Sequence, residues 1–196
     1  MDWDERYSEE GFAYGTAANE FLMSVADRIP HGNILSLAEG EGRNAVYLAS
    51  LGYQVTGVDG SEVGLRKARE LATEHGVAIT TIHADLNTYQ IGAEQWNGII
   101  ACYCHVPSQL RIPLHQAVVR GLRPGGVFVL QAFTKEQLAY GTGGPLSLDM
   151  LMSLDDLKRE LAGLEFIHAE QMERDVREGS GHTGLASVVQ VLAQKP

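Results

Sequence analysis

The chain has 196 residues, 44% apolar and 20% charged, so it is long enough for one domain with a large core, and its composition excludes a disordered protein. The net charge of −10 opposes binding to the phosphates of DNA or RNA. We find neither a membrane-length apolar run nor a secretory leader, and the two cysteines make no disulfide framework. We therefore expect a cytoplasmic protein, a monomer or homodimer, without nucleic-acid or membrane partners.

The N-terminal segment is unusually aromatic for a disposable tail. Its first 15 residues contain five acids, one base and four aromatic side chains: Trp3, Tyr7, Phe12 and Tyr14. This density is typical of a cover over a ligand, and equally of a short helix held on the domain surface. Apolar residues at helical spacing then predict a helix over residues 17–29, ended by Pro30 and Gly32.

The following stretch has the order strand, glycine turn, helix, strand, acid. Apolar runs predict strands at 34–38 and 55–58. Gly40 and Gly42 between them let the main chain approach a ligand, and the next helix offers free N–H groups. Asp59, at the carboxyl end of the second strand, is suited to accept both hydroxyls of a ribose, so the stretch is built to hold a nucleoside.

Two other interpretations of this motif stay open at this point. Gly40-x-Gly42-x-x-Ala45, with Asp59 19 residues beyond Gly40, also fits the fingerprint of dinucleotide-binding proteins. A plain tight turn uses glycines in the same way. The later segments decide between these interpretations.

The middle of the chain continues the alternation of helices and strands. Ser61 is suited to cap a helix that ends at His75-Gly76, and β-branched residues predict a strand over 77–82. Alternating elements predict a parallel sheet with right-handed crossovers, which bind ligands at the carboxyl ends of their strands. Asp85 lies at such an end, where its carboxylate accepts an adenine amino group or caps a turn.

A fourth strand is predicted over residues 96–105. His105 at its end has the chemistry of a general base or substrate ligand, and equally of a polar loop residue. Cys102-x-Cys104-His105 resembles metal-ligand spacing, but the chain has no further cysteine, so we expect no metal site and assign both cysteines to the core.

The C-terminal part completes the sheet. Residues 122–130 combine a helix end, a Pro-Gly-Gly turn and a fifth strand. Residues 141–145 form a glycine-rich loop, which is either a lid or substrate loop or a plain surface connection. After a short helix from Ser153, residues 164–176 and 185–193 predict an antiparallel hairpin.

These elements predict an α/β protein with a Rossmann-like doubly wound sheet of about seven strands, mostly parallel, with a C-terminal antiparallel hairpin. We assign residues 1–196 to a single domain. Residues 1–30 form an N-terminal cover and helix, and residues 31–196 form the Rossmann-like core.

This pattern resembles the class I S-adenosylmethionine-dependent methyltransferases over nearly the whole chain. Residues 35–49, 55–61 and 84–86 look most like the tellurite-resistance methyltransferase branch, and the Gly42-Arg-Asn-Ala45 continuation is the most specific part. The resemblance implies S-adenosylmethionine as cofactor. It places the methionine end, the ribose, the adenine, the sulfonium pocket and the N-terminal cover on the following residues: Tyr7, Tyr14, Glu39, Gly40, Gly42, Asn44, Asp59, Gly60, Ser61, Asp85, Leu86 and Cys102.

The chain departs from the family pattern at three positions. Ser36 stands where the first strand usually has an acid, and Ala38 stands where the loop usually has its first glycine. Asn97 stands where the fourth strand usually begins with an aspartate. Ser36 and Ala38 weaken the expected contacts to the methionine ammonium, for which Glu39 offers a nearby carboxylate. The departures leave the predicted fold unchanged.

The expected function is methyl transfer to a small-molecule acceptor such as a thiol or chalcogen oxyanion. A general base is needed only if the nucleophile arrives protonated. The catalytic candidates are His105, His182 and Arg177, and Arg174 joins the last two as a partner for an oxyanion unless the hairpin is simply a solvated charged surface. The alternatives are a non-catalytic binding module of the same fold and, with less support, an NAD-dependent oxidoreductase.

Overall fold

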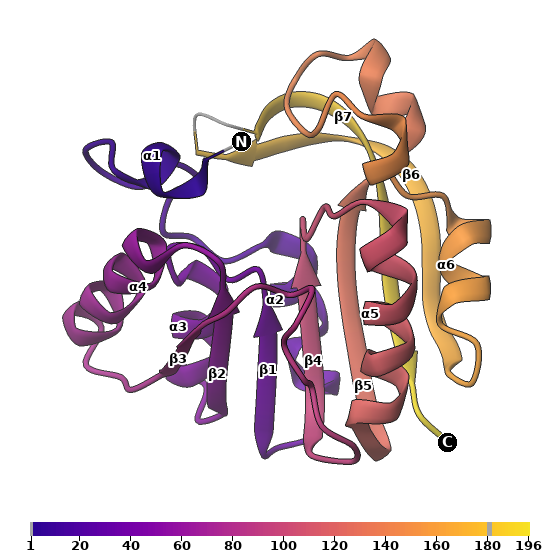
Figure 1. The fold of residues 1–196 in the computed structure, drawn as a ribbon, viewed down its shortest axis with the longest axis horizontal. Coiled ribbons are helices and arrows are strands. Elements are labelled where there is room, and N and C mark those ends of the chain that lie inside the picture. The colour runs from indigo at the N-terminus through magenta and orange to yellow at the C-terminus, as the bar shows by residue number, and fades with distance from the viewer. Residues whose placement is uncertain (1, 180–181) are drawn as a thin grey trace.

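The sheet has seven strands in the order β3-β2-β1-β4-β5-β7-β6 (Figure 1). It is seen in a computed structural model that describes residues 2–179 and 182–196, apart from the side chain of His182. Strands β1 to β5 run parallel, whereas β7 pairs antiparallel with both β5 and β6. The predicted Rossmann-like mixed sheet with a C-terminal hairpin is confirmed.

The elements have the following bounds in the described residues. The strands are β1 Asn33–Leu37, β2 Gln54–Asp59, β3 Thr80–His83, β4 Trp96–Cys102, β5 Leu122–Phe133, β6 Glu165–Glu178 and β7 His182–Gln194. The α-helices are α1 Trp3–Tyr7, α2 Glu20–Val25, α3 Arg43–Ser50, α4 Glu62–Glu74, α5 Ser108–Gly121 and α6 Leu154–Glu160. Three 3₁₀ helices complete them: η1 Ala26–Arg28, η2 Lys135–Ala139 and η3 Leu148–Met150.

Helices cover both faces of the sheet because successive strand residues point to opposite sides. Leu35 and Leu37 of β1 pack with the core side chains of α5 and α6. Ile34 packs with those of α2 and α3 on the other face. Figure 1 shows α5 lying across the β4–β5 region on the viewer's side. The central strands β1, β4 and β5 are therefore largely buried on both faces, as their apolar runs predict, whereas the edge strands β3 and β6 are partly exposed.

Two segments that are distant in sequence meet above the carboxyl ends of the strands. In Figure 1 the β6–β7 hairpin extends beyond the sheet and curves toward α1, which lies above α4. A Cβ atom added to Gly179 at the hairpin tip would lie 2.5 Å from the carbonyl oxygen of Ala13. The N-terminal segment and the hairpin therefore form a roof over this edge.

Several predicted bounds are wrong. The helix expected over 17–29 is shorter, because Val25 leaves helical geometry and η1 follows. The strand expected at 77–82 begins only at Thr80, where pairing with β2 starts, while Val77 packs against the α3–α4 region. The hairpin strands reach Glu178 and His182, so the connection is shorter than expected.

Candidate functional site

The turn after β1 is held in left-handed backbone conformations. Ala38 has φ of 52°, a value that glycine adopts without the steric cost of a Cβ atom. At Gly40, with φ of 63°, a Cβ would lie 2.6 Å from the hydroxyl of Tyr7. At Gly42 a Cβ would lie 2.6 Å from the Cα of Ala68. Gly40 thus admits the N-terminal segment, and Gly42 admits close packing of α3 on α4.

Asp59 joins this turn to the end of β2. Its Oδ2 accepts a hydrogen bond from the N–H of Gly40 and its Oδ1 from the N–H of Ser61, both at 2.8 Å. Burial of the carboxyl raises its pKa. Gly60 faces open space, since a Cβ there would meet no described atom within 4 Å. The main chain of Gly60 also donates to this carboxylate, whose two oxygens together offer about four acceptor sites, so capacity remains for a ribose diol.

Glu39 is a buried carboxylate within the glycine turn. Its Oε1 accepts a hydrogen bond from the N–H of Ala45 at 3.0 Å, and its stem packs on Gly57. Its Oε2 is buried and has no hydrogen-bond partner among the described residues. Burial raises the pKa of Glu39 to about 6, opposed by the nearby hydroxyl of Ser36 and by the N–H of Ala45. A buried, unpaired carboxylate oxygen is costly, and a cationic ligand group would satisfy it.

The N-terminal segment lies directly on this turn. The buried ring of Tyr7 sits over Gly40 and Gly64, and the hydroxyl of Ser61 donates to Asp4 at 2.5 Å. Lys67 of α4 donates to the carbonyls of Glu9 and Gly11 and to the carboxylate of Glu41. The structure shows the short surface helix and its packing on the glycine turn, while a cover over a ligand stays a prediction.

A polar chain starts at the end of β4. Cys102 is buried, and burial raises the pKa of its thiol. Tyr103 has φ of 57°, and its hydroxyl accepts a hydrogen bond from Gln131 at 2.6 Å. Gln190 donates in turn to Gln131 at 2.7 Å. We did not identify these three polar residues from the sequence; the available signal was Gln131 within the apolar run of β5.

His105 lies just beyond β4 with both ring nitrogens engaged. Its Nε2 accepts from the N–H of Phe133 at 3.2 Å, which leaves Nδ1 as the donor to the carbonyl of Met150 at 2.9 Å. Burial lowers the pKa of His105 to about 4. The imidazole is thus neutral near pH 7. This arrangement favours a role for His105 in holding the loop, rather than a role as a general base.

The hairpin tip is tied to α3 by a buried ion pair. Arg43 donates to Glu178 at 2.5 Å, and Asn19 donates to the other oxygen of Glu178 at 2.8 Å. Asn44 accepts from the N–H of Asn19 at 2.9 Å, so its carbonyl serves this junction. Arg177, in contrast, has a side chain that is 81% exposed and pairs with Asp175. The side chain of His182 lies outside the described residues.

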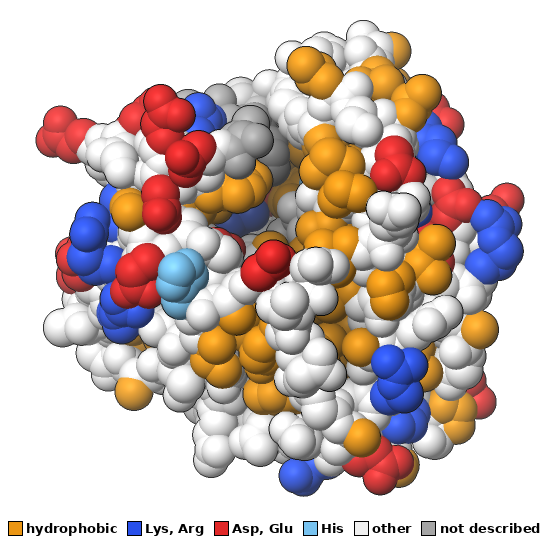
Figure 2. Space-filling model, viewed as in Figure 1, with side chains coloured by type: hydrophobic (Ala, Val, Ile, Leu, Met, Phe, Trp, Pro, Cys, Tyr) orange, Lys and Arg blue, Asp and Glu red, His pale blue; other side chains and the backbone are white. Residues whose placement is uncertain are grey.

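Asp85 and Leu86 follow β3 at the same edge. Asp85 is exposed, and its Oδ1 accepts from the N–H of Asn87 at 2.8 Å, which forms a local turn. Leu86 is partly buried against the core on the α5 side. Figure 2 shows a hollow at this edge, between the acidic N-terminal segment and a group of apolar side chains.

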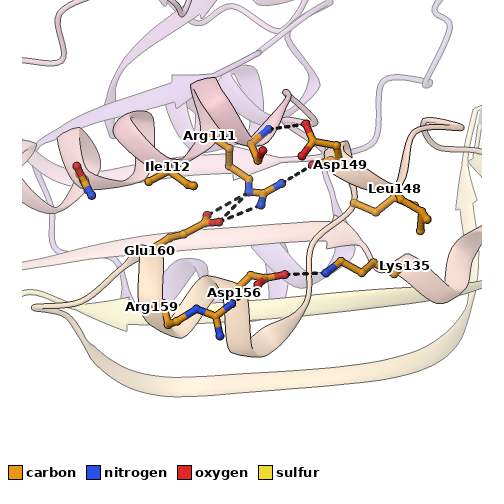
Figure 3. A pocket seen from close by; sticks show the side chains of 11 residues that line it. Arg111, Ile112, Lys135, Leu148, Asp149, Asp156, Arg159 and Glu160 are labelled. Atoms are coloured by element: carbon orange, nitrogen blue, oxygen red, sulfur yellow. Dashed lines mark hydrogen bonds and ion pairs between the residues drawn. The ribbon is translucent and has the colours of Figure 1, made fainter.

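A separate cavity of about 690 Å³ lies between α5, the η2–η3 segment and α6 (Figure 3). Its charged side chains neutralise one another, as Arg111 pairs with Glu160 at 2.9 Å and Lys135 with Asp156 at 3.0 Å. None of the site residues predicted from the sequence lines it. The strand ends therefore remain the candidate site.

Comparison with known proteins shows which class of enzyme the chain is similar to. A family model described as "Methyltransferase domain" matches residues 34–126, which include the glycine turn, Asp59 and β4. The mixed sheet in the order seen here is the class I methyltransferase fold, and the matched segment covers just under half of the chain. This similarity points to S-adenosylmethionine as the methyl donor, and the buried, unpaired oxygen of Glu39 fits the ammonium group of such a ligand.

Individual relatives agree with this class. The chain is 26% identical over 137 residues to the 2-heptyl-1-hydroxyquinolin-4(1H)-one methyltransferase of Mycobacteroides abscessus, covering 68% of this chain and 60% of the relative. It is 30% identical over 115 residues to the uncharacterized methyltransferase YodH of Bacillus subtilis, covering 59% and 49%. TehB from Haemophilus influenzae has a similar fold, with a TM-score of 0.76 at 21% identity over 92% of this chain and 63% of TehB.

The helices were also compared with the requirements of a membrane span. Within residues 2–179 and 182–196, none is both long and apolar enough to cross a bilayer.

Proposed function

We propose that this protein transfers the methyl group of S-adenosylmethionine to a small-molecule acceptor at the carboxyl edge of the sheet. The observation that carries the proposal is that the family-matched segment, residues 34–126, supplies the glycine turn, the acid of β2 and the end of β4 around one edge. Strand ends at this position are where open α/β sheets bind ligands.

We propose distinct roles for the predicted cofactor residues. Glu39 and the glycine turn hold the methionine end, and Asp59 with Gly60 and Ser61 holds the ribose. Asp85 and Leu86 frame the adenine. The remaining predicted residues form the wall and the cover: Cys102 lines the sulfonium side, Asn44 braces α3, and Tyr7 and Tyr14 cover the site.

The bound cofactor supplies an electrophilic methyl group, so the protein's main task is alignment. Holding the two reactants in line and excluding water contributes roughly 7–11 kcal/mol in favourable cases. A general base contributes less, about 10²–10⁴-fold. The roof made by Tyr7 and the hairpin tip serves the exclusion of water, and His105 positions the end of β5 through its two main-chain hydrogen bonds.

The relative from Mycobacteroides abscessus is named for a small quinolone substrate, which supports a small-molecule acceptor here. The Gly42-Arg-Asn-Ala45 motif supports a relation in sequence to the tellurite-resistance branch. We also propose a cytoplasmic protein, because Cys102 and Cys104 are buried free thiols. We retain the monomer or homodimer prediction.

Thermal unfolding with S-adenosylmethionine, S-adenosylhomocysteine and NAD tests the proposal. A ligand at about 100 times its dissociation constant adds roughly 2.7 kcal/mol to the free energy of unfolding. We expect both adenosyl ligands to raise the midpoint of the wild type and to raise that of Asp59→Ala much less. Stabilisation by NAD alone would overturn the assignment. Binding without turnover of any acceptor would favour the non-catalytic module.

A further inference from the structure

An apolar rim flanks the hollow at the strand ends. We use this name for four exposed leucines: Leu138 of η2, Leu146 of the following segment, Leu148 at the start of η3 and Leu185 near the start of β7. Their exposed fractions are 40% for Leu138, 92% for Leu146, 56% for Leu148 and 49% for Leu185. Figure 2 shows apolar side chains gathered on the side of the hollow that faces away from the acidic N-terminal segment. Single exposed leucines are ordinary, but a group beside a cleft indicates a binding surface.

The rim is held in place by hydrogen bonds to β7. The hydroxyl of Thr142 donates to the carbonyl of Leu185 at 2.7 Å, and the amide of Gln137 donates to Thr142 at 2.9 Å. The carbonyl oxygen of Gln137 accepts from the N–H of Ser187 at 2.9 Å. The leucines are therefore exposed by a defined structure, and the 141–145 segment is braced against the hairpin.

An apolar layer continues from the rim to the end of β4. A Cβ added to Gly144 would lie 2.7 Å from the ring of Phe133. That ring lies 4.7 Å from the ring of Tyr103, centroid to centroid. Tyr103 and Met172 are the partly exposed members of the cluster that Phe133 forms with β6 and β7. The buried ring of Phe133 thus connects the segment that carries the rim with Tyr103, which follows the end of β4.

Three described arginines near the strand ends already have carboxylate partners, whereas Arg6 of α1 lies 6.0 Å from the centroid of the Tyr14 ring. Arg43 pairs with Glu178, Arg174 with Glu20 and Arg177 with Asp175. An oxyanion requires charge-assisted bonds from such groups, so binding one here would break existing pairs. The overall charge of −10 adds to this cost. The charges favour an acceptor that is recognised mainly by apolar contact.

We propose that the acceptor is an amphiphile whose apolar tail lies along the rim and whose nucleophilic head lies beside Tyr103. This inference rests on the proposed function and specifies its substrate class. The segment that carries the rim packs on the same cluster as Tyr103, and apolar side chains line this side of the hollow in Figure 2. This position beside the cofactor edge favours a substrate tail over a lipid bilayer or a second copy of the chain.

Equilibrium binding to the protein loaded with S-adenosylhomocysteine tests the tail. The probes are 1-hydroxyquinolin-4(1H)-ones with 2-methyl, 2-propyl and 2-heptyl groups, alkanethiols of matching lengths, and sodium tellurite. Each methylene placed on the rim should lower the dissociation constant about threefold to fourfold. We expect this dependence in at least one series and no saturable binding of tellurite.

Paired variants locate the tail. The double variant Leu146→Ser with Leu148→Ser should reduce the heptyl-to-methyl affinity ratio at least tenfold and leave the methyl compound unchanged. Both side chains are more than half exposed, so the melting temperature should not move. Leu51→Ser is the matched control, because Leu51 is 44% exposed at the end of α3, away from the rim.

Each remaining outcome decides against the inference. Affinity independent of chain length, saturable tellurite binding, or an unchanged ratio in the double variant would overturn it. If the double variant loses binding to phosphatidylglycerol vesicles while its heptyl-to-methyl affinity ratio is unchanged, the rim binds a membrane. If it instead loses self-association in sedimentation with an unchanged ratio, the rim binds a second copy of the chain. Absence of S-adenosylhomocysteine binding by the wild type would refute the proposed function itself.

Discussion

Glu39 places a carboxylate near the position in β1 at which the chain lacks the usual acid. Ser36 occupies the usual acid position in β1, and the structure shows Glu39 within reach of it, with one oxygen bound to Ala45 and the other buried and unpaired among the described residues. The presence of this carboxylate follows from the sequence. Its orientation does not, because it depends on the close approach to Gly57 across β2.

Glu39→Gln should weaken binding of the amino-acid end of the cofactor and leave binding of the adenosine end unchanged. Removing the charge should weaken S-adenosylhomocysteine binding about tenfold to a hundredfold, since a hydrogen bond to a charged group contributes roughly 1.5–3 kcal/mol. Binding of 5′-methylthioadenosine, which lacks the amino-acid end, should stay unchanged. Isothermal titration of both ligands checks this, with Asp59→Asn as a control that weakens both. If Glu39→Gln weakens the binding of both ligands equally, Glu39 does not contact the amino-acid end of the cofactor.

Glu39 should also make stability depend on pH. Its pKa is raised from 4.5 to about 6, so between these values the folded state holds more protons than the unfolded state. The free energy of unfolding therefore falls as pH rises through this window, by about 2 kcal/mol from this group. Arg43, Asp59, Tyr7 and Cys102 face the same carboxyl from the neighbouring elements.

The measurement is urea unfolding of wild type and Glu39→Gln from pH 4.5 to pH 7. We expect the stability of the variant to improve relative to the wild type by about 2 kcal/mol across this range. The comparison cancels the other titrating groups. A constant difference would show that Glu39 titrates alike in both states.

At the scale of elements, the junction between α3 and the hairpin depends on a pair separated by 135 residues, Arg43 and Glu178. Periodicity and glycine turns predict that a hairpin forms. They do not predict which element the hairpin tip contacts, because that depends on the length and curvature of β6 and β7. The same reason explains the incorrect bounds at Thr80, which starts a strand only where β2 offers a partner.

Glu178→Ala should destabilise the fold by about 3–5 kcal/mol, because it leaves the buried guanidinium of Arg43 unpaired. Arg177→Ala is the matched control one residue away, and its exposed pair with Asp175 should contribute less than about 1 kcal/mol. Chemical denaturation of both variants provides the comparison. Similar small effects would mean that the hairpin tip is held mainly by its main-chain contacts.

At the scale of the whole molecule, the sequence predicts which edge of the sheet carries the site but not how that edge is closed. Strand alternation and the glycine motif predict the class of sheet and bring Asp59 and Asp85 to one side. The roof arises from contacts between the two ends of the chain, such as Gly179 against Ala13, and no local pattern encodes them. Tyr103 and Gln131 were missed for the same reason, as their bond joins two strands.

This closure makes a kinetic prediction. Tyr7 lies over the glycine turn, so a ligand held there leaves only when residues 2–15 lift away. Lys67 ties that segment down through two carbonyls and Glu41, and Lys67→Met should therefore raise the dissociation rate of S-adenosylhomocysteine severalfold. The melting temperature should fall as well, because the buried carboxylate of Glu41 loses its cation. Stopped-flow displacement measures that rate. Lys195→Met is the control, since Lys195 likewise binds a carbonyl and a carboxylate, those of Leu122 and Glu94, near the C-terminus. An equal rate increase in both variants would indicate general loosening, whereas an increase in Lys67→Met alone would identify the N-terminal segment as the gate.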